Sequence, residues 1–206
     1  DSESIWIHAV SVGEVQATIP LVSALKNRFP ERKIVITTVT PTGSDQVKKI
    51  YKDQVTHCYI PFETSFSVRN FFNALKPSIA LIMETEIWPN LYGECGQRGI
   101  ILVLVSAKIS AKSLKSYKRL LPLFRETLSH GILIAAQTLI DAERFVSLGA
   151  DKDKTWVMGN IKFDFNSPLD TETRGINFRY DHFQDRPVWI AASTHQGEEK
   201  IILNAH

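Results

Sequence analysis

Short apolar runs alternate along the chain with longer segments in which apolar residues recur at helical spacing. The runs lie at residues 5–10, 33–39, 56–60, 79–83, 100–105, 131–136 and 155–158. Helical spacing is clearest at 14–29 and at 141–148, where Thr138 or Asp141 is expected to cap the helix. Continuously apolar strands are typical of a parallel sheet that is buried on both faces. The pattern predicts an α/β fold: a Rossmann-like parallel sheet with helices on both faces.

A break in this pattern follows residue 165. The stretch 166–185 is polar and contains Pro168 and Gly175, which favours a linker. An apolar run at 188–192 then leads through a polar loop into a helical stretch. We therefore expect a first domain at 1–165, a linker at 166–185 and the truncated start of a second domain at 186–206. Both ends of the chain are expected to be cut relative to the gene product.

Composition excludes several classes of protein. The 206 residues are 44% hydrophobic and 22% charged, which is ordinary for a globular protein. The net charge of +2 is too small to indicate nucleic acid binding. Cys58 and Cys95 lie in no metal-ligand spacing, so a reducing compartment is a simpler interpretation than a disulfide scaffold. No apolar run reaches the roughly 20 residues that cross a bilayer.

Candidate chemistry is sought where strands end, because ligands of open α/β sheets bind beyond the carboxyl ends of the strands. The first such loop contains Ser11, Gly13 and Glu14. Gly13 permits a tight turn into the following helix. Glu14 either accepts a proton from an attacking hydroxyl group or only complements the helix dipole. Spacing alone favours the dipole.

The strand at 79–83 runs directly into two carboxylates, Glu84 and Glu86. Trp88 and Pro89 follow, and proline is suited to the first turn of a helix. An apolar strand that ends in two acids at this edge of the sheet points to a binding or catalytic pair. A solvated capping pair is an equally weighted alternative.

Two later loops offer weaker candidates. Lys162, after Asn160, would present positive charge to a phosphate or a sugar carboxylate, although an exposed connector lysine is favoured from residue type alone. Ser193, Thr194 and Glu198 lie at the turn into the last helical stretch. Hydroxyl groups at such a turn either cradle an anion or a nucleotide or simply cap the helix.

A basic, serine-rich stretch follows the strand at 100–105. Its cations are Lys108, Lys112, Lys115, Lys118 and Arg119. Lysines at helical spacing usually form a solvated face. They would also suit an anionic lipid surface or a phosphorylated acceptor.

Five segments taken together resemble the bacterial 3-deoxy-D-manno-octulosonic acid (Kdo) transferases of lipopolysaccharide biosynthesis. They are His-Ala-Val-Ser-Val-Gly-Glu (8–14), Thr-Pro-Thr-Gly-Ser (40–44), Met-Glu-Thr-Glu-Ile-Trp-Pro-Asn (83–90), Gly-Asn-Ile-Lys-Phe-Asp (159–164) and Ala-Ala-Ser-Thr-His-Gln-Gly-Glu-Glu (191–199). Their order is that of the family, and they cover nearly the whole chain. The resemblance implies a GT-B glycosyltransferase of which this chain is the N-terminal, acceptor-binding domain and the start of the C-terminal, CMP-Kdo-binding domain.

The resemblance also implies an activity and a location. CMP-Kdo would be the donor and the phosphorylated, tetraacylated lipid A precursor (lipid IVA) the acceptor. The reaction would invert the anomeric centre without a metal ion or other cofactor. The protein would be held at the cytoplasmic face of the inner membrane by an N-terminal anchor that lies outside this chain.

The family's site residues carry over position by position. Glu14 matches the catalytic base, and Glu84 and Lys162 match positions that stabilise the transition state. The remaining candidates, expected to bind substrate, are Ser11, Gly13, Glu86, Asn160, Ser193, Thr194 and Glu198. Two alternatives stay open: a GT-B transferase that uses a different nucleotide sugar, and a non-catalytic binding module in which the acidic loops are structural.

Overall fold

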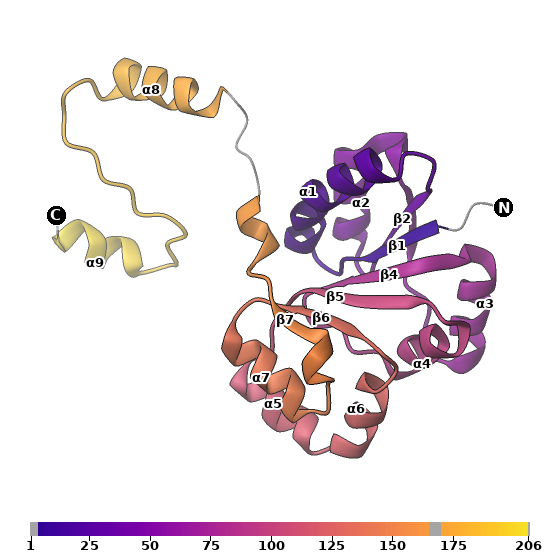
Figure 1. The fold of residues 1–206 in the computed structure, drawn as a ribbon. Helices are drawn as coiled ribbons and strands as arrows, with labels where there is room; N and C mark the ends of the chain where they lie inside the picture. Colours follow the sequence, from indigo (N-terminus) through magenta and orange to yellow (C-terminus); the bar gives the residue numbers. More distant parts are fainter. Residues whose placement is uncertain (1–3, 165–169, 206) are drawn as a thin grey trace. The chain divides into compact units, whose positions relative to one another are not determined.

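The computed structural model describes residues 4–164 and 170–205, which fall into two compact units, Asp1–Phe165 and Asn166–His206 (Figure 1). In the first unit seven strands form one parallel sheet in the order β3-β2-β1-β4-β5-β6-β7. They are β1 (Ser4–His8), β2 (Ile34–Thr38), β3 (Thr56–Tyr59), β4 (Pro77–Met83), β5 (Ile101–Ala107), β6 (Leu133–Ala136) and β7 (Thr155–Val157). The expected α/β fold with a parallel sheet is confirmed.

Helices cover both faces of the sheet because neighbouring side chains of each strand point to opposite sides. Ile5 and Ile7 of β1 pack in a core with helices α1 (Val12–Arg28) and α2 (Pro41–Tyr51), whereas Trp6 packs in a second core. The second core includes residues of α3 (Ser65–Leu75), α4 (Pro89–Arg98), α6 (Leu121–Leu128) and α7 (Leu139–Ser147). Figure 1 shows α1 and α2 on the side of the sheet opposite α3 and α4.

Hydroxyl side chains start most of these helices at the edge of the sheet where the strands end. Ser11, Thr40, Thr64 and Thr138 each accept a hydrogen bond from the backbone N–H three residues later. Ser110 does the same for α5 (Ala111–Lys118). Such caps satisfy backbone donors that have no partner within the helix. They fix the angle at which each chain segment leaves the carboxyl edge of the sheet.

The second unit contains two helices within its described residues, α8 (Thr171–His182) and α9 (Glu198–Ala205). Helix α9 confirms the helical stretch expected there. The strand expected at 188–192 is wrong, because these residues form no strand and residues 170–205 offer no second strand to pair with. The expected linker contains α8, a helix without a buried residue, so its polar composition did not reveal it. Pro168 lies outside the described residues.

Candidate functional site

Two acidic loops meet where the strand order of the sheet reverses. Strand β1 pairs with β2 on one side and with β4 on the other, and the chain leaves their carboxyl ends toward opposite faces. The loop after β1 carries Glu14, and the loop after β4 carries Glu84 and Glu86. All three side chains line one cavity of about 400 Å³. Crevices at such a reversal are the usual ligand sites of open α/β sheets.

Glu14 is held in one orientation at the start of α1. Its Oε2 accepts a hydrogen bond from the backbone N–H of Val10 (2.9 Å), and its Oε1 accepts one from the Ser11 hydroxyl (2.9 Å). The Ser11 oxygen in turn accepts the Glu14 backbone N–H (3.3 Å), which closes a capping arrangement. Ser11 is therefore the N-cap of α1 and Glu14 supports it from the first turn, while Glu14 also lies in the wall of the cavity with 8% of its surface exposed.

Glu84 forms the centre of a charged cluster. Its Oε1 accepts a hydrogen bond from Lys162 Nζ at 2.8 Å, and its Oε2 lies 2.9 Å from Lys108 Nζ. Burial alone raises the pKa of the Glu84 carboxyl. The hydrogen bonds and charges of the two lysines outweigh burial and hold the pKa below the ordinary value of a glutamate. Glu84 therefore stays ionised at neutral pH.

The backbone is strained at the ends of the two central strands β4 and β5. Glu84 has φ +55° and Ser106 has φ +57°, both in the left-handed region that non-glycine residues seldom adopt. The Glu84 N–H donates to the Val105 carbonyl (2.8 Å), which links the two strand ends. Strain of this kind costs roughly 1–3 kcal/mol per residue and concentrates at functional sites.

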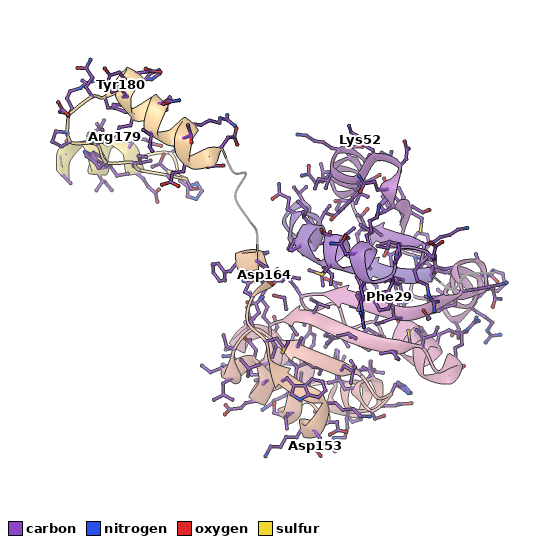
Figure 2. The ribbon with its side chains drawn as sticks, turned by 45° about the horizontal axis from the view of Figure 1, so that its top comes forward. Phe29, Lys52, Asp153, Asp164, Arg179 and Tyr180 are labelled. Carbon is purple, nitrogen blue, oxygen red and sulfur yellow. The ribbon has the colours of Figure 1, made fainter. Side chains whose placement is uncertain are left out.

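Lys162 reaches this cluster from η3 (Ile161–Asp164), the turn that follows β7; Asp164 at its end is labelled in Figure 2. Its backbone N–H donates to Asn160 Oδ1 at 3.0 Å. Asn160 Oδ1 also lies 3.3 Å from the Ser106 hydroxyl. The predicted pair Asn160 and Lys162 thus belongs to the same site as the acidic loops.

Glu86 is the third carboxylate of the cavity. Its Oε2 accepts a hydrogen bond from the Trp88 indole N–H (3.0 Å), and its backbone carbonyl accepts one from the Tyr92 hydroxyl (2.6 Å). Burial raises the pKa of Glu86, and the negative charges of Glu14 and Glu84 raise it further, against the opposing effect of Trp88. Glu86 therefore lies close enough to Glu14 and Glu84 for their charges to disfavour its ionisation.

Most of the other residues in the cavity wall have polar side chains, although Ile109 is apolar. Lys108, Asp141 and Arg144 contribute charges, and Ser110, Ser113 and Tyr117 contribute hydroxyl groups. Carboxylates accept hydrogen bonds from sugar hydroxyls, and the serine and tyrosine hydroxyls both donate and accept. The arrangement can bind a polyhydroxylated ring and place one of its hydroxyl groups against a carboxylate.

A second cavity of about 560 Å³ flanks the first. Gly13 and Lys162 line it, together with apolar residues that include Ile19, Pro20 and Ile50. Its walls carry one formal charge, that of Lys162. The start of α1 therefore borders both cavities, with Gly13 in the second and Glu14 in the first, and Lys162 of the second cavity contacts Glu84 of the first.

The five predicted basic residues do not act as one group. Lys108 points to Glu84 in the cavity. The other four, Lys112, Lys115, Lys118 and Arg119, are exposed on α5 and just beyond its end.

Ser193, Thr194 and Glu198 belong to the second unit. Glu198 Oε2 accepts the backbone N–H of His195 at 2.8 Å, at the start of α9. Ser193 has φ +58°.

Several residues of the site were missed from the sequence. The sequence suggests Asp141 only as a helix cap, whereas in the structure its Oδ1 accepts the backbone N–H of Ile109 at 2.9 Å. Arg144 Nη1 donates to the Ile109 carbonyl, so both residues of α7 hold the loop that carries Lys108. Thr138 is the N-cap of α7, which confirms the first of the two expected alternatives, Thr138 or Asp141. The position of Asp141 after a strand end was the signal that could have revealed it.

Two further features concern metal ions and membranes, and both statements apply to residues 4–164 and 170–205. No group of three or more His, Cys, Asp or Glu side chains is arranged there to hold a metal ion. No helix in these same ranges is both long and apolar enough to cross a membrane.

Comparison with known proteins agrees with the motifs. The family model described as 3-deoxy-D-manno-octulosonic-acid transferase (kdotransferase) matches residues 1–165. The chain belongs to the Kdo transferase family. The matched range contains both acidic loops and Lys162, so the cavity lies within the part that defines the family.

The curated relatives include proteins that are named as Kdo transferases. The 3-deoxy-D-manno-octulosonic acid transferase of Haemophilus influenzae is 43% identical over 204 residues, 99% of this chain and 48% of that protein. The protein of the same name from Bordetella pertussis is 33% identical and is covered to 47%. A bifunctional glycosyltransferase/methyltransferase of Fusobacterium nucleatum is 34% identical and is covered to 32%. The chain thus spans half or less of each of these relatives.

Solved structures support the fold. The UDP-GlcNAc 2-epimerase of Neisseria meningitidis bound to UDP-GlcNAc matches 88% of this chain and 52% of its own, with a TM-score of 0.57 and 15% identity. Another UDP-N-acetylglucosamine 2-epimerase matches 93% of this chain and 63% of its own, with a TM-score of 0.57 and 16% identity. At this identity the likeness concerns architecture, and it agrees with a Rossmann-like half of a GT-B enzyme.

Proposed function

We propose that the full-length protein transfers Kdo from CMP-Kdo to a hydroxyl group of the phosphorylated lipid A precursor, with inversion at the anomeric carbon. Membership of the Kdo transferase family supports the transferred sugar. The single observation that carries the chemistry is the cavity at the strand reversal, which Glu14, Glu84 and Glu86 all line. Carboxylates at this edge are suited to activate a hydroxyl nucleophile.

Glu14 is the proposed general base. The acceptor hydroxyl oxygen attacks the anomeric carbon of Kdo and its proton passes to the Glu14 carboxylate. The bond between the anomeric carbon and the phosphate oxygen breaks, and CMP leaves with the electron pair. Hydrogen bonds from Val10 and Ser11 support this role because they fix the carboxylate while leaving lone pairs free on both oxygens.

Glu84 is proposed to organise positive charge rather than to exchange a proton. Both of its oxygens bind ammonium groups, from Lys162 and Lys108, and its lowered pKa keeps it ionised. The two lysines would then present positive charge to the Kdo carboxylate or to the departing phosphate. Charge that is already in place before the reaction stabilises the transition state most effectively.

The acceptor is proposed to enter the polar cavity with its sugar ring. Four acids and two cations line this space, so its own net charge is negative and it favours hydroxyl donors over a phosphate group. The exposed cations of α5 would meet the acceptor's phosphates or the anionic surface of the inner membrane at its cytoplasmic face.

The division of labour between domains is part of the proposal. Residues 1–165 would bind the acceptor, 166–185 would connect, and 186–206 would begin the donor-binding domain, in which Ser193, Thr194 and Glu198 would contact CMP-Kdo. Support comes from the family match to residues 1–165 and from relatives about twice as long as this chain. No nucleic acid partner is proposed.

The test is a transfer assay on the full-length protein. Labelled CMP-Kdo is supplied with and without the lipid A precursor, and UDP-N-acetylglucosamine replaces it in a parallel reaction. We expect labelled lipid only when CMP-Kdo and the acceptor are both present. Transfer from the other nucleotide sugar would establish a different GT-B transferase. Absence of transfer from any donor, with acceptor binding retained, would indicate a binding module and contradict the proposal.

A further inference from the structure

Ser106 interrupts strand β5 beside the catalytic cavity. The register between β5 and β6 shifts between Val105 and Ala107, so Ser106 is an extra residue, a β-bulge. It is 4% exposed and has φ +57°. A buried serine in the left-handed region is held there by its surroundings, and bulges next to active sites typically redirect a side chain.

The redirected hydroxyl binds the segment that follows β7. Ser106 Oγ donates to Asn160 Oδ1 (3.3 Å) and accepts the backbone N–H of Ile161 (3.3 Å). Asn160 Oδ1 also accepts the backbone N–H of Lys162 (3.0 Å). The amide of Gln137 donates to the Ser106 carbonyl (2.9 Å), which anchors the bulge to the neighbouring strand end. Two side chains therefore satisfy two consecutive backbone N–H groups of η3.

These contacts fix the backbone position from which the Lys162 side chain extends. Its ammonium group meets Glu84 Oε1 at 2.8 Å, but 43% of the lysine side chain is exposed. A lysine stem has four flexible carbon atoms and loses much rotational freedom when its end is fixed. Holding the backbone of residues 161 and 162 limits how far the ammonium group can stray from the carboxylate.

We propose that Ser106 and Asn160, here called the Ser106–Asn160 pair, are positioning residues that hold the Lys162 ammonium group against Glu84. This inference rests on the proposed function, in which Lys162 stabilises the transition state. Asn160 would then orient Lys162 through contacts within the protein, whereas the sequence suggested that Asn160 contacts substrate. It also explains why a strained serine occupies the bulge, because the contact to Asn160 requires a hydroxyl group.

Two substitutions at Ser106 separate the effect of losing the hydroxyl group from the effect of backbone strain. Ser106→Ala removes the hydroxyl and keeps a side chain at positive φ, whereas Ser106→Gly removes the hydroxyl and relieves the strain. Asn160→Leu removes the acceptor oxygen at similar size, and Asn160→Asp keeps oxygens that accept both hydrogen bonds. We expect kcat in the full-length protein to fall about 10-fold to 100-fold in both Ser106 variants and in Asn160→Leu. Asn160→Asp should recover most of that loss.

A double-mutant cycle tests whether the pair acts through Lys162. In a Lys162→Ala background, Ser106→Gly should cause almost no further loss of kcat, because the group that it positions is gone. An undiminished loss in that background would overturn the proposal, and so would wild-type kcat in Ser106→Gly. If Ser106→Gly kept the wild-type kcat and only Ser106→Ala lost activity, backbone strain and not the missing hydroxyl group would explain the loss. That outcome would also contradict the proposal.

A second readout does not depend on sugar transfer. Carboxyl-carbon NMR of Glu84 in the full-length protein should show titration at a higher pH in Ser106→Gly than in the wild type, because Lys162 no longer stays in contact. Titration at the same pH in both proteins would overturn the proposal. If the wild type transferred no Kdo, the proposed function would fail in the assay above, while this titration would still decide the role of the pair.

Discussion

Lys162 Nζ lies 2.8 Å from Glu84 Oε1, although 78 residues separate them in the chain. The sheet brings them together because the segments after β4 and after β7 both leave its carboxyl edge. Lys108 Nζ lies 2.9 Å from the other oxygen of the same carboxylate. A single glutamate therefore fixes two ammonium groups beside the cavity that also contains Glu14.

Neutralising Glu84 tests the importance of this arrangement. In Glu84→Gln the two lysines lose their shared anion, and we expect kcat for Kdo transfer to fall about 100-fold. The free energy of unfolding should change by less than about 1 kcal/mol, because the lysine partners are half exposed. Steady-state kinetics and thermal unfolding of the full-length protein measure the two effects.

A matched control breaks an ion pair elsewhere. Glu94→Gln removes the contact between Glu94 and Arg98 (2.6 Å) on α4, and kcat should remain that of the wild type. Equal losses of kcat in Glu84→Gln and Glu94→Gln would show that any lost ion pair lowers activity, and would contradict a specific role for Glu84.

His8 gives the fold a predictable response to acid. It is fully buried at the end of β1, and its Nδ1 shares a hydrogen bond with Thr37 Oγ1 (2.8 Å). Burial lowers the pKa of His8 to about 4, against a smaller opposing effect of Thr37. The unfolded chain therefore binds a proton near pH 6.5, whereas the folded chain binds it only near pH 4.

Because protonation favours the unfolded state in this range, stability is greatest above about pH 6.5 and is lost as pH falls toward about 4. The loss attributable to His8 is roughly 3 kcal/mol. His8→Asn removes this titration, and denaturant unfolding at several pH values should show a shallower decline in the variant than in the wild type. Parallel declines in the two proteins would contradict the assignment.

Alanine substitutions at Gly149 and Gly159 distinguish the stability cost of steric crowding from that of backbone strain. Gly149 has φ +107°, and a Cβ there would lie 2.7 Å from Arg125 Cγ and 3.0 Å from Arg125 Cα. Gly159 has φ +86° with nothing within 4 Å. We expect Gly159→Ala to cost about 1 kcal/mol from strain alone and Gly149→Ala to cost about 3 kcal/mol because a backbone atom must also move. Urea unfolding measures both, and equal losses would contradict the crowding at Gly149.

The exposed lysines of α5 are predicted to serve the anionic acceptor. Charge reversal of Lys112, Lys115 and Lys118 to glutamate should raise KM for the lipid acceptor about 10-fold and leave KM for CMP-Kdo unchanged. The matched control reverses three exposed lysines near the end of α2, Lys48, Lys49 and Lys52. An unchanged acceptor KM in the α5 variant, or the same increase in the control, would contradict the prediction.

The strands were predictable from the sequence for a physical reason. A parallel sheet covered on both faces favours apolar residues at nearly every strand position, and such runs are easily recognised. The run at 188–192 shows the limit of this reasoning. Its composition favours a strand, but a strand also needs a partner, and residues 170–205 supply none.

The site was predictable where residue type and position both pointed to it. Glu14, Glu84 and Lys162 follow strand ends and carry charge, so the position of the loops makes them candidates. Position alone still favours a structural role for Glu14 and Lys162, and the family resemblance is needed to single them out. Ser106 could not be found this way, because a serine inside an apolar run gives no sign of a bulge or of positive φ. The proposed role of Ser106 can be derived only from its contact with Asn160 in the structure.

The central claim is that Glu14 accepts the proton of the attacking hydroxyl. The most direct test is Kdo transfer from CMP-Kdo to the lipid A precursor by full-length Glu14→Gln beside the wild type, with Glu143→Gln, an exposed carboxylate on α7, as control. Circular dichroism confirms that all three proteins are folded. We predict that kcat falls by at least about 100-fold in Glu14→Gln alone. Transfer at the wild-type rate by folded Glu14→Gln would contradict the account.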